Sequence, residues 1–400
     1  MHVRSAECGV GDAWTRGTRP AVRSPQSALS CLIALLAALG AGAAEGPPEK
    51  ADPAVARLEA LRPKLWGKDK AEREKAYEAY LAEGEAGRKR LAEELLAIRS
   101  AALAACREMA LPDETQKKLL AAHAKLAEAR KEALRVIFDK AIYPDANHGR
   151  AGQPAVDKAV DAVKAAYPAY RRAFDPVVKR FEPLPRIAER LKELDAQLEK
   201  LGVASLEPAP PLEKLVRCDP ELLKALQEEA AYAALCERLA RYNRLIRTTT
   251  TADERQVVDL TNEYRMQLGL RPLAISEPLA QAARKHSQEM QRLGYFAHNS
   301  PTPANRTPQL RCLNEGYRHF AGENCASGPA AAQGAFNGWY NSSGHHRNML
   351  GSRHTEMAVG RAGSLWTEVF GGRPDLDLDN PPRALPRAPA PPRKDVPRQK

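Results

Sequence analysis

The chain is poor in aromatic side chains and lacks the local motifs that carry most enzymatic chemistry. Phe, Trp and Tyr together make up 6% of its 400 residues. No Ser or Cys stands in a recognisable nucleophile context, and no H-E-x-x-H metal motif occurs. The net charge of +11 would suit an anionic partner, but the basic residues form no stripe interleaved with aromatics. We therefore expect dispersed surface charge and no nucleic-acid partner.

Long apolar runs are also lacking. The apolar run 28–39 follows several arginines and precedes the small residues 40–44. A signal peptide typically has a positively charged stretch, a short apolar run and a cleavage site of small residues. The apolar run is too short to predict a membrane span. We expect residues 1–44 to be a signal peptide. The protein would then be secreted or periplasmic, at the cell envelope, with no transmembrane anchor in the mature chain.

Cysteines are few, and five remain once that segment is removed: Cys106, Cys218, Cys236, Cys312 and Cys325. An exported chain permits disulfides, but an odd number leaves at least one thiol free or intermolecular. The connectivity is not decided by the sequence.

Residues 50–247 have the patterns of a mostly helical region of unknown function. Apolar residues step by four and three in the manner of a short coiled coil: Ile187, Leu191, Leu194, Leu198 and Leu201. Asp219 before Pro220 predicts the start of a further helix. The loop that begins at Tyr143 is polar and turn-forming. We interpret this region as a helical spacer or a partner-docking bundle.

A second domain is expected at 252–372. Thr251 and Glu254 have the spacing of a capping box, which would begin its first helix. Beyond it, residues 373–400 are rich in proline and arginine and cannot bury a core, so a disordered tail is predicted.

The segment 252–372 resembles a CAP domain in its compact bacterial form. This superfamily comprises the cysteine-rich secretory proteins, antigen 5 and the plant pathogenesis-related proteins. The pieces that carry the resemblance, in chain order, are Leu260 to Arg265, Leu268 to Leu273, Leu279 to Ala283 with Met290, Phe296 to His298, Gly322 to Asn324, Trp339 to Leu350, and Val359 to Arg361 with Trp366 to Gly371. The resemblance implies an α-β-α sandwich for this segment. With the mostly helical region before it, we expect an α+β chain.

The resemblance also implies a cleft lined by His298, Glu323 and His345. The larger members carry a further His where this sequence has Leu365, so the set of four side chains is incomplete here. His345 and its neighbour His346 lie about 100° apart on a helical turn, so one of them faces the cleft, and the motif favours His345. We expect Arg347 and Asn348 to brace the loop or the Glu323 carboxylate. Cys312 and Cys325 both lie in this segment, flank the loop into Glu323 and are the best candidate disulfide.

Three chemistries fit such a cleft. Two imidazoles and a carboxylate could hold a divalent metal such as zinc or copper. Glu323 could act as a base with a His as acid. The same groups could also only fix the loops. We expect a non-catalytic extracellular or cell-envelope module that binds a lipid, polysaccharide or protein, or mediates adhesion. The alternative is a metal-dependent hydrolase that uses the same cleft.

Overall fold

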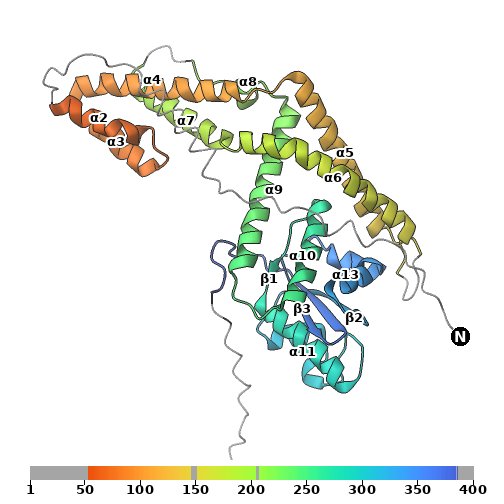
Figure 1. Cartoon of the computed structure of the whole chain (residues 1–400). Coiled ribbons are helices and arrows are strands. Elements are labelled where there is room, and N and C mark those ends of the chain that lie inside the picture. The colour runs from red at the N-terminus through yellow and green to blue at the C-terminus, as the bar shows by residue number, and fades with distance from the viewer. Residues whose placement is uncertain (1–52, 146–150, 204–206, 384, 386–400) are drawn as a thin grey trace, which may run out of the picture. The chain divides into compact units, whose positions relative to one another are not determined.

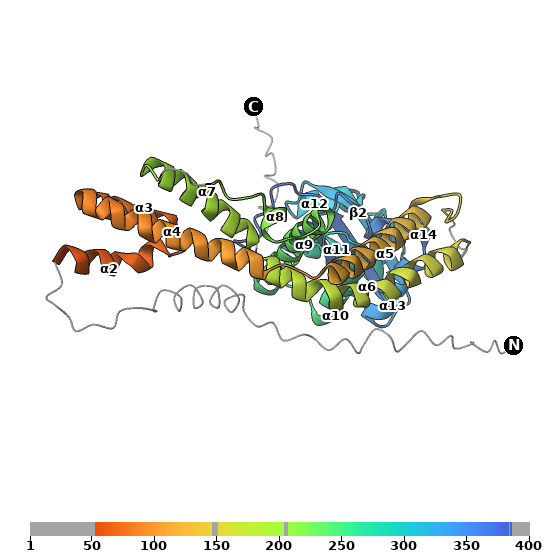
Figure 2. The same cartoon turned by 90° about the horizontal axis from the view of Figure 1, so that it is seen from above.

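The computed structural model describes residues 53–145, 151–203, 207–383 and 385 (Figures 1 and 2). The predicted signal peptide and most of the proline- and arginine-rich tail lie outside these residues. Among the described residues, none of the helices combines the length and the apolar composition that a membrane span requires.

The contacts divide the chain into two compact units that differ from the two ranges expected from the sequence. Of the described residues, the first unit comprises those up to Met109 together with those of Pro183–Val216, and the second comprises those of Ala110–Glu182 together with those from Arg217 onward. The expected helical region is thus shared between two units. Part of it packs with the segment that resembles a CAP domain.

The first unit is all helical in its described part. Its core contains Leu91, Leu95 and Ile98 packed with Leu194 and Leu198, so the four–three apolar stripe of the sequence is buried against a neighbouring helix. Its helices are α2 (Pro53–Leu65), α3 (Lys70–Ala82), α4 (Gly84–Glu108), α7 (Leu184–Lys200) and α8 (Leu212–Leu215).

The second unit combines helices with one small sheet. Helices α5 and α6 lie side by side in both views (Figures 1 and 2). Its helices are α5 (Asp113–Phe138), α6 (Gln153–Phe181), α9 (Pro220–Leu245), α10 (Ala252–Gln267), α11 (Glu277–Leu293), η1 (Pro303–Asn305), α12 (Pro308–Asn314), α13 (Ala332–Tyr340) and α14 (Ser343–Met349). Its strands are β1 (Ala274–Ile275), β2 (Phe320–Ser327), β3 (Glu356–Ala362) and β4 (Leu365–Gly371).

The sheet has the order β1-β3-β4-β2, which places β2 at one edge. Strand β1 is parallel to β3, whereas β3 with β4 and β4 with β2 are antiparallel. Helix α11 covers one face, and α10 with α13 covers the other, as Figure 1 shows. The expected α+β architecture with helices on both faces of a sheet is confirmed.

Local signals fix where the helices of this unit begin. The Asp219 carboxylate accepts hydrogen bonds from the backbone N–H groups of Glu221 and Leu222 at the start of α9. Thr251 and Glu254 form the predicted capping box at the start of α10. Helix α9 also binds the edge strand β1. The Asn243 side chain donates a hydrogen bond to Leu273 O (3.0 Å) and accepts one from Ile275 N–H (2.8 Å).

Candidate binding site

The two faces of the edge strand β2 carry different polar groups. Successive side chains of a strand point to opposite faces, so Glu323 and Cys325 share one face and Asn324 points to the other. Cys325 is paired in register with Thr367, whose hydroxyl lies 2.9 Å from that of Ser287 on α11. Glu323 and Cys325 therefore face the α11 side of the sheet.

Glu323 is buried and fully engaged. Its side chain is 3% exposed, and its two carboxylate oxygens lie 3.0 Å from His298 Nδ1 and 2.6 Å from an Arg311 guanidinium nitrogen. Burial alone would raise the pKa of Glu323. The hydrogen bond to His298 and the charge of Arg311 outweigh burial, so the pKa of this carboxyl lies below its usual value. Glu323 is an ionised acceptor at neutral pH.

His298 and His345 come together at the edge of the sheet. The His298 side chain is 52% exposed, and its ring centroid lies 6.4 Å from that of His345. Because Nδ1 of His298 faces Glu323, Nε2 is the nitrogen that a ligand would meet. Burial, and then the charge of His298, lowers the pKa of His345, so this imidazole is neutral at neutral pH. The structure thus places His298 beside both Glu323 and His345.

His346 points away from this site, as the helical spacing predicts. It is fully buried, and its Nε2 lies 2.7 Å from the Tyr264 hydroxyl. The ring of Tyr340 packs against it with a centroid distance of 4.6 Å. Burial and the charge of Arg347 lower the pKa of His346 to about 3. This imidazole is a neutral core group.

The opposite face of β2 holds the turn that carries His345. The Asn324 amide donates to His345 O (3.2 Å) and to a Glu368 carboxylate oxygen (2.9 Å), and its oxygen accepts from Asn348 (2.9 Å). Gly322 makes room for this contact, because a Cβ there would lie 2.2 Å from Asn348 Oδ1. The Gly-Glu-Asn sequence therefore has three separate roles: Gly322 leaves space, Glu323 orients His298, and Asn324 fixes α14.

Glu368 completes this buried network. It accepts a hydrogen bond of 3.1 Å from the Thr261 hydroxyl in addition to the one from Asn324. Burial raises the pKa of Glu368 to about 7, although these hydrogen bonds act in the other direction. We therefore expect this network to respond to pH near neutrality.

Arg347 and Asn348 do not contact Glu323 in the structure. Asn348 binds Asn324, and Arg347 turns toward the helical hairpin of α5 and α6. Its guanidinium donates to Ile137 O (3.0 Å) and Tyr143 O (2.9 Å) and pairs with Asp145. Of the two targets expected for Arg347 and Asn348, the loop or the Glu323 carboxylate, the carboxylate is paired instead with Arg311 of α12.

Arg311 and His286 were not predicted to belong to the site. Cys325 was predicted only as half of a disulfide. His286 on α11 is fully buried, with Nε2 3.0 Å from Ala297 O. Ligand atoms of His286, Glu323 and Cys325 all lie within 4.8 Å of one another. The i,i+2 spacing of Glu323 and Cys325 in a strand was a usable signal for one shared face. Arg311 gave no signal, because its partner lies twelve residues away on another element.

A known protein family matches the segment that contains these residues. The model of the cysteine-rich secretory protein family, CAP, matches residues 258–365. This segment is a CAP domain.

Two curated relatives come from Bacillus subtilis (strain 168). The uncharacterized protein YkwD is 38% identical over 128 residues, which are 32% of this chain and 49% of that protein. The uncharacterized membrane protein YlbC is 37% identical over 126 residues, which are 30% of this chain and 34% of that protein. The chain thus spans about half the length of the first and a third of the second.

Two solved structures match about a third of the chain. An extracellular protein containing a SCP domain from Bacillus anthracis is 33% identical, with 30% of this chain and 40% of that chain covered and a TM-score of 0.29. An outer surface protein from Borrelia burgdorferi is 19% identical, with 32% of this chain and 99% of that chain covered and a TM-score of 0.28.

The cysteines of the CAP domain are not joined in the structure. Cys312 and Cys325 are both buried free thiols, which differs from the expected disulfide. The Cys325 sulfur lies 3.5 Å from Glu323 Oε1 and 3.7 Å from His298 Nδ1, so the strand directs it toward the site. Burial, and then the charge of Glu323, raises the pKa of Cys325 well above its usual value. A protonated thiol here is a weak donor to the carboxylate.

Proposed function

We propose that this is an exported binding protein of the cell envelope, whose CAP domain holds its ligand at His298 and His345 without catalysing a reaction. One observation carries the proposal: the Glu323 carboxylate is buried and paired with Arg311 at 2.6 Å. The export part depends on the predicted signal peptide at 1–44. The natural ligand would be an extracellular lipid, polysaccharide or protein.

Glu323 is poorly suited to act as a general base. A catalytic base works best when its pKa lies near the operating pH. The pKa of Glu323 is lowered, and one of its oxygens accepts a charge-assisted hydrogen bond from Arg311. Proton abstraction by this group would require breaking a buried ion pair. The hydrolase alternative therefore has no available base in Glu323.

The same geometry suits Glu323 as a carboxylate that orients a metal-binding histidine. Histidines that bind metals usually place the second ring nitrogen against a carboxylate, which fixes the tautomer and the ring orientation. Nδ1 of His298 is 3.0 Å from Glu323, and the side chain is half exposed. His298 and His345 are the residues that would hold a zinc or copper ion, with Glu323 behind them.

The test is a calorimetric titration of zinc into the full chain at neutral pH, with hydrolysis measured on the same preparation. We expect binding by the unchanged protein and at least about a tenfold loss of affinity in His345→Ala. His319→Ala is the matched control, because His319 is an exposed histidine outside the pair, and it should bind zinc normally.

The zinc-loaded protein should hydrolyse neither a nitrophenyl ester nor a casein-derived peptide faster than the zinc-free protein. Hydrolysis that depends on zinc and disappears in His345→Ala would overturn the non-catalytic proposal. Equal zinc affinity in His345→Ala and the unchanged protein would remove His345 from the binding site.

A further inference from the structure

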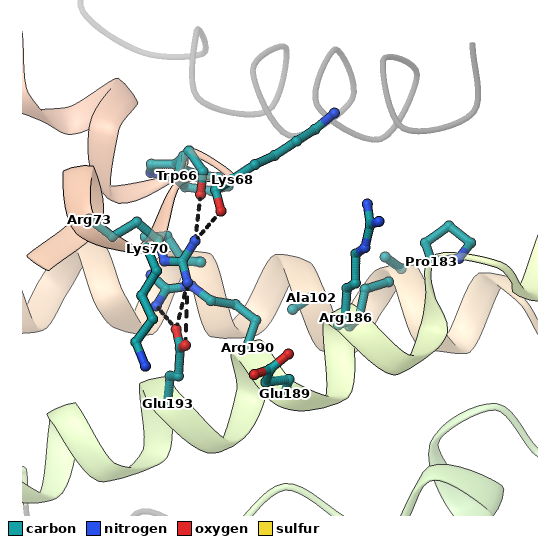
Figure 3. A pocket seen from close by; sticks show the side chains of 14 residues that line it. Trp66, Lys68, Lys70, Arg73, Ala102, Pro183, Arg186, Glu189, Arg190 and Glu193 are labelled. Atoms are coloured by element: carbon teal, nitrogen blue, oxygen red, sulfur yellow. Dashed lines mark hydrogen bonds and ion pairs between the residues drawn. The ribbon is translucent and has the colours of Figure 1, made fainter. Parts of the chain in front are cut away.

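The helical unit outside the CAP domain contains a cavity of about 390 Å³. All of its lining residues belong to the first unit, from the end of α2, the α2–α3 turn, α3, α4 and the start of α7 (Figure 3). The volume lies within the range of about 300 to 1,000 Å³ that is usual for small-molecule sites.

The floor of this cavity is apolar. Its apolar lining residues are Ile98, Ala102 and Ala105 from α4 and Ile187 from α7, which together we call the floor. Figure 3 shows Trp66 at one end. Ala102 and Ala105 are small side chains, and both line the cavity. An aliphatic or aromatic group placed there would be removed from water.

The rim is mainly cationic. Five basic residues line the cavity, against two acidic ones, Glu189 and Glu193. Glu193 is already used, because it pairs with Arg73 and Arg190, each at 2.9 Å, at one end of the cavity (Figure 3). The free charge of the rim is therefore positive.

Several of these cations have unused hydrogen-bonding capacity. Arg73 Nε is buried and has no hydrogen-bond partner within the described part of the chain. Arg186 lies at the other end of the cavity, near Pro183 (Figure 3). Arg186, Lys68 and Lys70 are exposed and form no ion pair with any residue that the structure describes. An acidic group on a ligand would pair with Arg186 at its end of the cavity.

We propose that this cavity binds a single-chain amphiphile with a carboxylate head. The aliphatic chain lies on the floor formed by Ile98, Ala102, Ala105 and Ile187, and the carboxylate meets the Arg186 guanidinium at the rim. An apolar floor under a positive rim matches both halves of such a molecule. The site is separate from the CAP domain, so it does not depend on the function proposed above.

Trp66 provides a direct readout. Trp66 lines the cavity, so a ligand there should change its fluorescence. Of the other three tryptophans, Trp339 and Trp366 are 1% and 0% exposed in the second unit, and Trp14 belongs to the predicted signal peptide. Dodecanoate is titrated into the full chain below its critical micelle concentration, with Trp66→Phe to identify the signal. Octanoate should bind more weakly, by about fourfold for each methylene no longer buried. Acetate and dodecyltrimethylammonium should give no saturable change.

Two variants separate the head from the chain. Arg186→Glu should weaken dodecanoate binding by about tenfold or more, because it replaces a charged donor with a repelling carboxylate. Lys192→Glu is the matched control, since Lys192 is exposed on the same helix and does not line the cavity, and it should bind normally. Ala102→Phe should fill the floor and abolish binding while its circular dichroism remains that of a folded protein.

Dodecyltrimethylammonium binding as well as dodecanoate, or equal effects of Arg186→Glu and Lys192→Glu, would overturn the assignment of an anionic head. Binding that survives in a folded Ala102→Phe protein would show that the amphiphile sits elsewhere.

Discussion

Arg311 donates a hydrogen bond of 2.6 Å to Glu323, and the two side chains are 4% and 3% exposed. This buried pair joins helix α12 to strand β2, and Arg311 also donates to Asn305 O (3.0 Å). The pair neutralises the carboxylate that orients His298. It therefore links the stability of the CAP domain to the geometry of its site.

Breaking this pair from one side should be costly. Arg311→Met leaves Glu323 buried without its counter-charge, and we expect a loss of about 3–5 kcal/mol in the free energy of unfolding. The double variant Arg311→Met with Glu323→Gln should recover much of that loss, because no buried charge is left unpaired. Chemical denaturation of the four proteins of this cycle measures both effects.

Lys285→Ala is the matched control for that cycle. Lys285 pairs with Glu315 at 2.6 Å, but its side chain is 58% exposed, so its loss should cost less than about 1 kcal/mol. Equal costs for Arg311→Met and Lys285→Ala would show that the Glu323 pair is no more than a surface contact.

Glu368 should make the protein less stable as pH rises toward neutrality. Its folded pKa of about 7 lies above the usual carboxyl value of 4.5, so its favourable contribution is complete below pH 4.5 and is lost as pH rises through 7. The Glu368→Gln variant should not lose stability in this way, because the Gln side chain does not ionise. We expect it to be more stable than the unchanged protein at pH 8 by roughly 1–3 kcal/mol, measured by urea denaturation.

Glu237→Gln, an exposed substitution on α9, serves as the control and should leave the pH dependence unchanged. If Glu368→Gln has the pH profile of the unchanged protein, the carboxyl titrates normally and the buried network does not respond to pH.

His346 should act in the opposite direction at acid pH. Its folded pKa of about 3 lies below the usual 6.5, so its contribution is complete above pH 6.5 and is lost as pH falls. Each proton withheld from the folded state costs about 1.4 kcal/mol per pH unit in this window. His346→Phe should have a shallower fall of stability between pH 6 and 4 than the unchanged protein. An unchanged slope, or the same reduction in the exposed variant His319→Phe, would contradict a buried neutral His346.

Much of this arrangement could be predicted from the sequence, because the signals were local or belonged to an ordered motif. The capping box of Thr251 and Glu254 and the cap at Asp219 fixed helix starts by bonds within three residues. The family resemblance allowed us to expect one cleft lined by His298, Glu323 and His345. Their spacing in the sequence alone does not predict that arrangement.

The rest depends on packing between distant segments. Nothing local indicates that Tyr143, in a loop predicted only as a turn, lies against Arg347 of the CAP domain. The burial of Arg311 could not be predicted either, because the sequence does not distinguish a buried arginine from an exposed one. A disulfide between Cys312 and Cys325 was predicted only because both lie in one segment. In the structure, the pleat of β2 directs the Cys325 side chain toward Glu323 instead.

Arg347 should couple the α5–α6 hairpin to the CAP domain. Arg347→Ala removes the hydrogen bonds to Ile137 O and Tyr143 O and the pair with Asp145. We expect a loss of roughly 2–4 kcal/mol in stability and faster amide exchange over residues 139–145. Hydrogen exchange read by mass spectrometry measures the exchange of residues 139–145, and urea denaturation measures the stability. Arg353→Ala, exposed in the loop after α14, should leave that exchange unchanged, and equal exchange in both variants would exclude the coupling.

The position of a bound zinc ion tests the central claim most directly. Crystals of the full chain soaked in zinc should show an anomalous peak beside Nε2 of His298 and a ring nitrogen of His345. The Glu323 carboxylate should remain between His298 Nδ1 and Arg311, as the distances of 3.0 and 2.6 Å now place it. A peak bound directly by Glu323, with Arg311 displaced, would contradict the account, as would the lack of any peak at this pair of histidines.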